Sequence, residues 1–210
     1  MNVVFDMDGP LLRLDVDLEE VRTRLGALFA PRGVVRPFRP VLRRIGEAAR
    51  EVGDPALEAA GLAILSEWEC RAAASARPRP GAAAVVSALA VRGDRLALLT
   101  DLGRACVALA LESARIPAAS WHAIVTRDDV PRGKPDPAGL RRAVERLGAE
   151  TTWYVVDHRR EAETGRGLGL RVAALVGDME SEAALRVAGA ERILGTLDEV
   201  LALPDIAQSP

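Results

Sequence analysis

Short apolar segments alternate with amphipathic segments along most of this chain of 210 residues. The apolar segments are rich in β-branched residues and are typical of strands buried on both faces of a parallel sheet. We expect strands at residues 3–5, 95–100, 123–126, 153–157 and 172–176, and a weaker one at 192–194. Apolar side chains recur at helical spacing between them, at 82/86/89, 107/111/114 and 140/144/147. The alternation predicts an α/β fold with a doubly wound parallel sheet covered by helices on both faces.

The segment 14–78 breaks this alternation, because it contains helical patterns only. Its apolar residues form three stripes, at 18/21/25/28, 41/45/48/52 and 57/61/64/68. Proline and glycine residues separate the stripes, and the sequence Pro-Arg-Pro-Gly at 78–81 marks the return to the alternating pattern. We therefore expect an α/β core domain made of residues 1–13 and 79–210, and an all-helical cap domain of residues 14–78 that covers the strand ends as a lid.

Composition excludes several classes of protein. An apolar fraction of 49% with 28% charged residues is typical of a soluble globular chain. The formal net charge of −2 gives no electrostatic reason to expect nucleic acid or an anionic membrane as a partner. No apolar segment approaches the ~20 residues of a membrane span, and the N-terminus lacks the basic region of a signal peptide, so we expect a cytoplasmic protein.

The two cysteines, Cys70 and Cys106, lie far apart in segments with helical patterns. Their spacing matches neither a disulfide framework nor a metal-binding motif. We expect both to be small, buried apolar residues.

The first expected strand ends in the sequence Asp6-Met7-Asp8-Gly9. Two carboxylates two positions apart on a strand point to one face, where their mutual repulsion favours a bound cation. The pattern suits a nucleophilic Asp6 and a general acid/base Asp8 beside a divalent metal ion. The alternative is a polar exit from the strand with Gly9 as a turn residue.

A second candidate segment is Thr100-Asp101, which leaves a strand and opens a helix. The N-terminus of a helix attracts anions through its free N–H groups, and this position would suit a phosphoryl group. Asp101 could also be a plain helix N-cap, and Thr100 an ordinary threonine at a strand end.

Lys134 is the one lysine among 28 basic residues. A compact ammonium can lie between a carboxylate and a phosphate, where a forked guanidinium would not substitute. The alternative is a solvated loop residue ahead of a helix that begins at Asp136-Pro137. Asp157, at the end of another strand, could bind Mg²⁺ together with Asp6 and the main-chain carbonyl of Asp8.

In chain order, four motifs resemble those of the haloacid dehalogenase superfamily, whose phosphatases carry a helical cap after the first strand. These motifs are Asp6-Met7-Asp8-Gly9, Leu98-Leu99-Thr100-Asp101, Gly133-Lys134-Pro135-Asp136-Pro137, and Val155-Val156-Asp157 followed by Glu161. The resemblance covers nearly the whole chain, and it points to the phosphoglycolate-phosphatase-like branch with a small helical cap of the C1 type.

This resemblance implies a Mg²⁺-dependent phosphatase that hydrolyses a small phosphorylated metabolite, with phosphoglycolate as the conventional substrate of the branch. Asp6 would attack phosphorus to form an aspartyl-phosphate, and Asp8 would act as general acid and base. The implied phosphate-binding residues are Thr100, Asp101 and Lys134, and the implied metal ligands are Asp6, Asp8 and Asp157, with Glu161 behind them.

Some other activities of the superfamily fit less well. Phosphonate-cleaving members use a cap lysine, and segment 14–78 contains none. Sugar phosphomutases also place a lysine in the cap, which disfavours them more weakly. Dehalogenases of the superfamily do not use the second acid, which is present here as Asp8.

Three residues depart from the pattern of the superfamily: Pro10 replaces a threonine, Val156 a glycine and Glu161 an aspartate. They motivate an alternative function, that of a binding or regulatory protein with weak or no activity. A further alternative is a protein-binding scaffold that uses the basic cap residues Arg32, Arg36, Arg39, Arg43 and Arg44, which a solvated helix face would explain as well. The sequence leaves the oligomeric state open.

Overall fold

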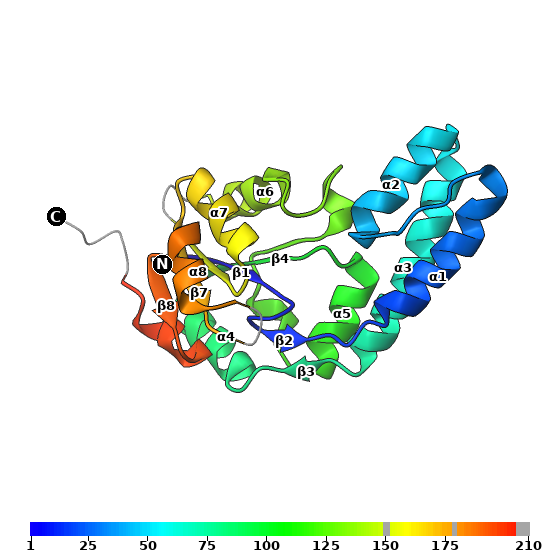
Figure 1. Ribbon diagram of the computed structural model, residues 1–210. Helices are drawn as coiled ribbons and strands as arrows, with labels where there is room; N and C mark the ends of the chain where they lie inside the picture. The colour runs from blue at the N-terminus through cyan, green and yellow to red at the C-terminus, as the bar shows by residue number, and fades with distance from the viewer. Residues whose placement is uncertain (149–151, 178–179, 205–210) are drawn as a thin grey trace.

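The computed structural model describes residues 1–148, 152–177 and 180–204. Its main sheet has six parallel strands in the order β5-β4-β1-β6-β7-β8 (Figure 1). The strands are β1 (Asn2–Asp6), β4 (Arg95–Leu99), β5 (Ala123–Val125), β6 (Trp153–Val156), β7 (Arg171–Leu175) and β8 (Arg192–Leu194). Each of them matches a segment expected from the sequence, and the predicted α/β fold with a doubly wound parallel sheet is confirmed.

Helices cover both faces of this sheet. One face packs against α4 (Ala82–Val91), α5 (Arg104–Ser113) and η4 (Leu197–Ala202), and the other against α6 (Ala138–Leu147), α7 (Arg159–Gly167) and α8 (Glu182–Ala188). Successive residues of β1 alternate between the two cores: Val3 and Phe5 lie in the first and Val4 in the second. Because both faces of the strand are buried, Asp6 at its end is its first charged residue.

The segment between β2 (Leu12–Arg13) and β3 (Arg77–Pro78) carries helices as its regular elements. They are α1 (Leu18–Phe29), η1 (Ala30–Arg32), α2 (Val41–Val52) and α3 (Pro55–Ala74). These helices enclose a hydrophobic cluster of their own, which includes Phe29, Phe38 and Ile45. Figure 1 shows this helical unit beside the sheet and joined to it through the antiparallel pair β2–β3. Among the described helices, none is both long and apolar enough to cross a membrane.

Two details of the helical unit differ from the sequence pattern. The buried stripe of α1 is Val21, Leu25 and Phe29, whereas Leu18 is 39% exposed. Leu18 is the first residue of the helix and lies at the wall of a cavity, so it does not reach the cluster inside the unit. The β2–β3 pair goes unnoticed in the sequence, because two residues per strand are too few to show an alternating pattern.

Two helices begin later than the sequence suggests. Helix α5 begins at Arg104 after Gly103, so Asp101 lies ahead of the helix and does not cap it. Helix α6 begins at Ala138, whose N–H donates a hydrogen bond of 3.0 Å to Oδ1 of Asp136. In both places the residues that the pattern assigns to the first helical turn lie in a short loop. In the loop before α5, the side chain of Asp101 is therefore available for other contacts.

The expectation for the two cysteines is wrong. Cys70 of α3 and Cys106 of α5 form a disulfide, with their Cα atoms 4.5 Å apart. The pairing depends on the packing of α3 against α5, and a separation of 36 residues in the chain does not reveal it. The bond joins the helical unit covalently to a helix that covers the sheet. Disulfides are uncommon in reducing compartments, and a cytoplasmic location stays a prediction.

Candidate active site

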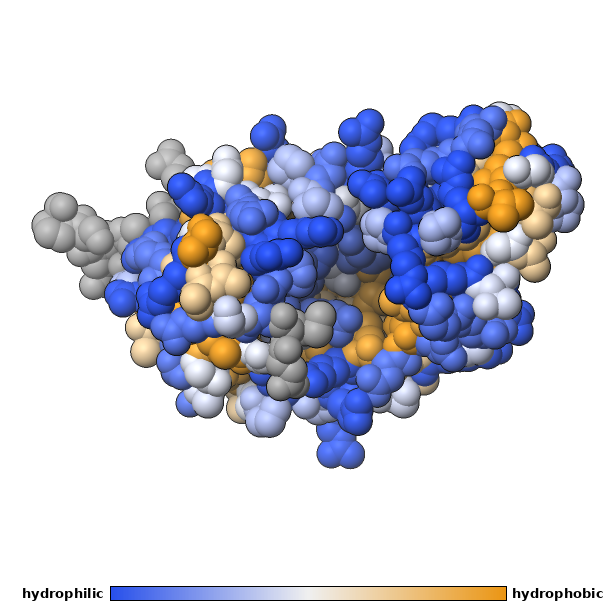
Figure 2. Space-filling model, viewed as in Figure 1, coloured by the Kyte–Doolittle hydropathy of each residue, from blue (hydrophilic) through white to orange (hydrophobic). Residues whose placement is uncertain are grey.

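A cavity of about 610 Å³ opens between the carboxyl end of the sheet and the helical unit. Figure 2 shows the hollow on the face seen there, with hydrophobic residues in its wall. All of the residues that the sequence suggests for catalysis, phosphate binding or metal binding line it: Asp6, Asp8, Thr100, Asp101, Lys134 and Asp157. They end or follow β1, β4, β5 and β6, and parallel strands bring their carboxyl ends to one edge of the sheet.

The wall facing these residues carries both apolar and charged side chains, the latter including Arg13 and Asp15. Leu14, Val16 and Leu18 precede or begin α1, and Leu65 comes from α3. Glu69 of α3 adds a carboxylate to the same wall. The cavity therefore lies between a charged floor and a wall of mixed character, in which Leu14, Val16, Leu18 and Leu65 supply the apolar part.

The centre of the charged floor is the contact between Asp6 and Lys134. The Nζ atom of Lys134 lies 2.6 Å from Oδ1 of Asp6 and 2.5 Å from Oε1 of Glu161. The same Oδ1 of Asp6 accepts a hydrogen bond of 2.8 Å from the N–H of Met7. Burial on its own would lower the pKa of Lys134, but Asp6 and Glu161 outweigh it and raise that pKa well above its usual value. Lys134 is therefore a permanent cation beside a buried carboxylate.

Asp8 opens on the cavity and has a different environment. Its Oδ1 accepts a hydrogen bond of 3.1 Å from the N–H of Leu14. The surrounding protein atoms, and then the charge of Asp6, raise the pKa of Asp8 to about 6. A carboxyl group that gains and loses a proton near neutral pH is suited to general acid and base chemistry.

The loop after Asp8 is built around a glycine and a proline. Gly9 has a φ of +106°, and a Cβ at this position would collide with the carboxylate of Asp157. The loop closes through backbone hydrogen bonds from Gly9 N–H to Leu12 O at 2.7 Å and from Leu11 N–H to Met7 O at 3.2 Å. Because these bonds hold the turn, the lack of an N–H at Pro10 leaves it intact.

Three carboxylates meet at one side of the cavity. Oxygen atoms of Asp6, Asp157 and Glu161 lie within 4.8 Å of one another. Burial, followed by the charge of Asp6, raises the pKa of Asp157 to about 6 and that of Glu161 to about 8. Glu161 Oε2 is buried and makes no hydrogen bond within the described part of the chain. Crowded, desolvated oxygens of this kind fit a hard divalent cation such as Mg²⁺, which would relieve their repulsion.

Two of the three basic residues after Asp157 lie beside Glu180, while His158 and Arg160 also line the cavity. His158 Nε2 lies 3.4 Å and Arg159 Nε 3.6 Å from Oε1 of Glu180. His158 also caps α7, since its Nδ1 accepts a hydrogen bond of 3.1 Å from the N–H of Arg160. Glu161 is one methylene longer than the aspartate of the superfamily pattern, and this length takes it to Lys134.

The side chains of Thr100 and Asp101 each accept a hydrogen bond from a backbone N–H group. Thr100 is 3% exposed, and its hydroxyl accepts a hydrogen bond of 3.2 Å from the N–H of Leu102. Such a hydroxyl still has a proton to donate to a phosphoryl oxygen. Asp101 Oδ1 accepts a hydrogen bond of 2.8 Å from the N–H of Lys134. Asp101 therefore holds the backbone of the loop that carries Lys134.

Sequence patterns miss two arginines that support the site. Arg79 lines the cavity, and its Nε donates a hydrogen bond of 2.8 Å to Gly9 O. Arg127 is buried behind the site and contacts Ser66, Glu69 and the carbonyl oxygen of Asp101. Both belong to a chain rich in arginine, so no compositional signal singles them out.

The basic cap residues take no part in the cavity wall. Each of them pairs with a carboxylate of the helical unit: Arg32 with Asp54, Arg36 with Glu51, Arg39 with Glu19, and Arg43 and Arg44 with Glu47. Ion pairs of this kind on a partly solvated helix surface explain these arginines without a binding partner.

Comparison with known proteins gives related results from sequence and from structure. The family model described as haloacid dehalogenase-like hydrolase matches residues 1–169. A phosphoglycolate phosphatase of Cereibacter sphaeroides is 31% identical over 183 residues, covering 81% of this chain and 83% of that protein. Phosphoglycolate phosphatase 1 of Pseudomonas aeruginosa is 29% identical over 187 residues, covering 82% and 68%.

Solved structures resemble the whole fold. A hydrolase from Pseudomonas syringae superposes with a TM-score of 0.71 at 20% identity, covering 98% of this chain and 99% of that one. CbbY from Rhodobacter sphaeroides, in complex with phosphate, superposes with a TM-score of 0.65 at 23% identity, covering 95% of each chain. At these identities the likeness concerns the fold, including the sheet edge at which the cavity lies.

Proposed function

The chain belongs to the haloacid dehalogenase-like hydrolase family, and from this membership and the cavity we propose that it is a Mg²⁺-dependent phosphatase acting on a small phosphomonoester. The observation that carries the proposal is the contact of 2.6 Å between Lys134 Nζ and Asp6 Oδ1 at the floor of the cavity. This contact supports Asp6 as the nucleophile and Lys134 as the phosphate-binding cation, and Asp8 lines the same cavity.

In the proposed first step, a carboxylate oxygen of Asp6 attacks phosphorus and the bond from phosphorus to the leaving oxygen breaks. Asp8, in its protonated form, donates its proton to that oxygen, and the alcohol departs. The product is an aspartyl-phosphate on Asp6. In the second step, Asp8 takes a proton from a water molecule, which attacks phosphorus and releases inorganic phosphate and the Asp6 carboxylate.

In this proposal, groups that line the cavity offset the charge on the phosphoryl oxygens. Lys134 supplies a fixed positive charge, and the Thr100 hydroxyl a hydrogen-bond donor. Asp101 acts on the same oxygens indirectly, because it holds the backbone N–H of Lys134. When bound by Asp6, Asp157 and the main-chain carbonyl of Asp8, Mg²⁺ would supply further positive charge at the transferring group. Glu161 lies close enough to this set to assist it.

The helical unit is proposed to be the cap of the enzyme, with residues 14–78 as cap and residues 1–13 and 79–210 as core. Its apolar residues Leu14, Val16, Leu18 and Leu65 face the charged floor, so they would exclude water around the reacting group when a substrate is bound. The two short strands β2 and β3 connect the parts and are the natural place for a hinge.

The substrate is proposed to be a small phosphorylated metabolite, and phosphoglycolate is the first candidate because relatives at 31% identity are phosphoglycolate phosphatases. The competing proposal is a family member with little or no turnover. It is motivated by Val156 and Glu161, which depart from the pattern of the superfamily.

Hydrolysis of p-nitrophenyl phosphate tests the proposal, measured with Mg²⁺ and with EDTA for the wild-type protein, Asp6→Asn and Asp198→Asn. Asp198 is an exposed carboxylate outside the cavity and is the matched control. We expect Mg²⁺-dependent release that Asp6→Asn abolishes and Asp198→Asn preserves. If the wild-type protein releases nothing from p-nitrophenyl phosphate or phosphoglycolate, and Mg²⁺ does not raise its melting temperature, the competing proposal is correct.

A further inference from the structure

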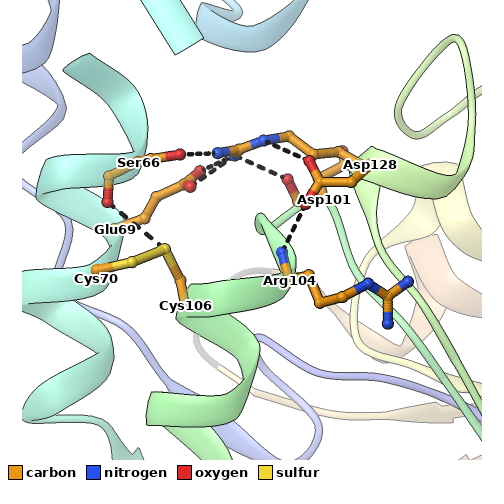
Figure 3. Close-up of a disulfide and its surroundings, with 8 residues drawn as sticks. Ser66, Glu69, Cys70, Asp101, Arg104, Cys106 and Asp128 are labelled. Carbon is orange, nitrogen blue, oxygen red and sulfur yellow. Dashed lines mark hydrogen bonds and ion pairs between the residues drawn. A yellow bond between two sulfur atoms is a disulfide. The ribbon is translucent and has the colours of Figure 1, made fainter. Parts of the chain in front are cut away.

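Arg127 is a buried arginine that contacts two separate parts of the molecule, helix α3 and the loop after β4. It begins the short helix η3 (Arg127–Asp129), and its side chain is 5% exposed. Nη1 donates hydrogen bonds to both carboxylate oxygens of Glu69, at 2.7 and 2.6 Å, and Nη2 donates one of 2.5 Å to Ser66 Oγ. Nη1 also lies 3.2 Å from the carbonyl oxygen of Asp101. Figure 3 labels the partners in these contacts, Ser66 and Glu69 of α3 and Asp101 of the loop after β4.

The contacts of Arg127 continue to the proposed nucleophile. Asp101, whose carbonyl oxygen Arg127 binds, accepts the hydrogen bond of 2.8 Å from the N–H of Lys134. Lys134 in turn lies 2.6 Å from Asp6 through its Nζ. A continuous series of hydrogen bonds thus runs from helix α3 to the floor of the cavity. Arg127 does not line the cavity, whereas Glu69 does.

Stability alone is a poor explanation for this arrangement. The free-energy cost of removing two charges from water often exceeds the gain from their attraction. Apolar residues of similar volume at such buried positions commonly give equal or greater stability. A lysine would neutralise Glu69, but its single nitrogen lacks the planar fork that reaches several acceptors in fixed directions. What a guanidinium adds here is a rigid link between Ser66 and Glu69 on one side and Asp101 on the other.

We propose that Arg127 is a positioning residue that fixes the Thr100-Asp101 loop relative to helix α3. Through Asp101 it sets the position of Lys134, and through Ser66 and Glu69 it ties that position to the proposed cap. This inference rests on the proposed phosphatase function. Arg127 contacts no substrate, so its removal lowers the fit of the site to a phosphoryl group without removing any group that reacts.

Two variants separate positioning from folding. Arg127→Lys keeps a positive charge beside Glu69, and Arg127→Met/Glu69→Met removes both buried charges together, so neither leaves an unpaired buried charge. Arg146→Met is the matched control. Like Arg127, Arg146 binds a backbone carbonyl and a carboxylate: Ile124 O at 3.1 Å and Oδ1 of Asp129 at 3.3 Å. These contacts do not include Asp101. Melting temperatures and kinetics on p-nitrophenyl phosphate are measured for all of them.

We expect Arg127→Lys to melt close to the wild-type temperature and yet to lose about 10- to 100-fold in kcat/KM, the size of effect that a misplaced catalytic group produces. The loss appears mainly as a higher KM, and inorganic phosphate inhibits the variant more weakly than it inhibits the wild-type protein. Arg146→Met keeps the kinetics of the wild-type protein. The inference is overturned if Arg127→Lys has wild-type kinetics, or if the activity of the variants follows their melting temperatures.

The outcome also distinguishes this inference from the proposed function. If the wild-type protein hydrolyses no phosphomonoester, the proposed function is wrong, and the effect of Arg127→Lys is measured by calorimetric binding of inorganic phosphate with Mg²⁺ present. Weaker binding by Arg127→Lys than by the wild-type protein and Arg146→Met supports the inference, and equal binding contradicts it. A wild-type protein that neither hydrolyses nor binds phosphate overturns both.

Discussion

The Nζ atom of Lys134 lies 2.6 Å from Oδ1 of Asp6, although 128 positions separate the two residues in the chain. Asp6 ends the central strand β1, and Lys134 lies in the loop between η3 and α6, beyond strand β5. The parallel sheet brings the two together because it collects the carboxyl ends of its strands at one edge. Most of what we expect of this site follows from that contact.

Replacing Lys134 by arginine is expected to inactivate the protein although the charge is kept. The guanidinium is larger and forked, and cannot occupy the space between Asp6 and Glu161 as an ammonium does. We expect kcat/KM on p-nitrophenyl phosphate to fall by about 10²- to 10³-fold, as when one transition-state donor is lost. Arg132→Lys, at an exposed position in the same loop, is the control and should change nothing. Full activity of Lys134→Arg would show that a guanidinium can replace the ammonium between Asp6 and Glu161.

Gly9→Ala is expected to damage both stability and metal binding. The residue has a φ of +106°, and its new Cβ would collide with the carboxylate of Asp157. Gly33 has a φ of +80° and open space around it, so Gly33→Ala carries the backbone strain of about 1–3 kcal/mol without the collision. Thermal melts with and without Mg²⁺ should show a larger loss for Gly9→Ala and no Mg²⁺-dependent shift. Equal behaviour of the two variants would show that the contact with Asp157 is unimportant.

The metal-free protein is expected to lose stability as the pH rises through the range in which Asp157 ionises. The pKa of Asp157 is raised from 3.8 to about 6 in the folded state, chiefly by burial. The folded state therefore binds this proton more tightly than the unfolded chain does. The stabilisation of the folded state by protonated Asp157 is complete below about pH 4 and is lost as the pH passes about 6.

In EDTA at pH 7, Asp157→Asn should therefore unfold with a free energy about 1 to 2 kcal/mol higher than that of the wild-type protein, allowing for solvent screening. Denaturant titrations at pH 4 to 7 measure the difference between the two proteins, which should grow with pH. Asp198→Asn, which removes an exposed carboxylate outside the cavity, is the control. A difference for Asp157→Asn that does not depend on pH would mean that burial does not disfavour its charge.

Reduction of the disulfide is expected to lower the free energy of unfolding by about 2 to 4 kcal/mol, since Cys70 and Cys106 close a loop across 36 positions of the chain. Thermal melts with and without dithiothreitol measure the effect. The double variant Cys70→Ala/Cys106→Ala should melt at about the temperature of the reduced protein, and dithiothreitol should not change its melting temperature. Two titratable thiols in the unreduced, denatured protein would contradict the disulfide itself.

Local patterns in the sequence predicted most of the fold. Each strand of the main sheet was recognisable because a strand buried on both faces must be apolar throughout, and a helix on its surface must be apolar on one side. The carboxylates Asp6 and Asp157 stood out because they follow such strands directly. The rarity of lysine in the chain drew attention to Lys134 for a reason that does not depend on the fold.

Other features left no trace in the sequence, because they depend on which surfaces meet. Arg127 is one arginine among many until α3 brings Glu69 to it, and Cys70 is a small helical residue until α5 places Cys106 beside it. The sequence predicted Asp101 as a phosphate-binding residue or, alternatively, a helix cap, whereas its side chain binds the backbone N–H of Lys134.

The order of the elements and the kinds of chemistry at the strand ends were thus determined by the sequence itself, since periodicity and strand termini are properties of neighbouring residues. The long-range partners of the charged side chains at the cavity, such as Asp6 for Lys134 and Glu69 for Arg127, were decided by the tertiary structure. A hydrogen bond or a disulfide requires two groups within a few ångströms, and only the packed helices and sheet bring together residues that lie tens of positions apart.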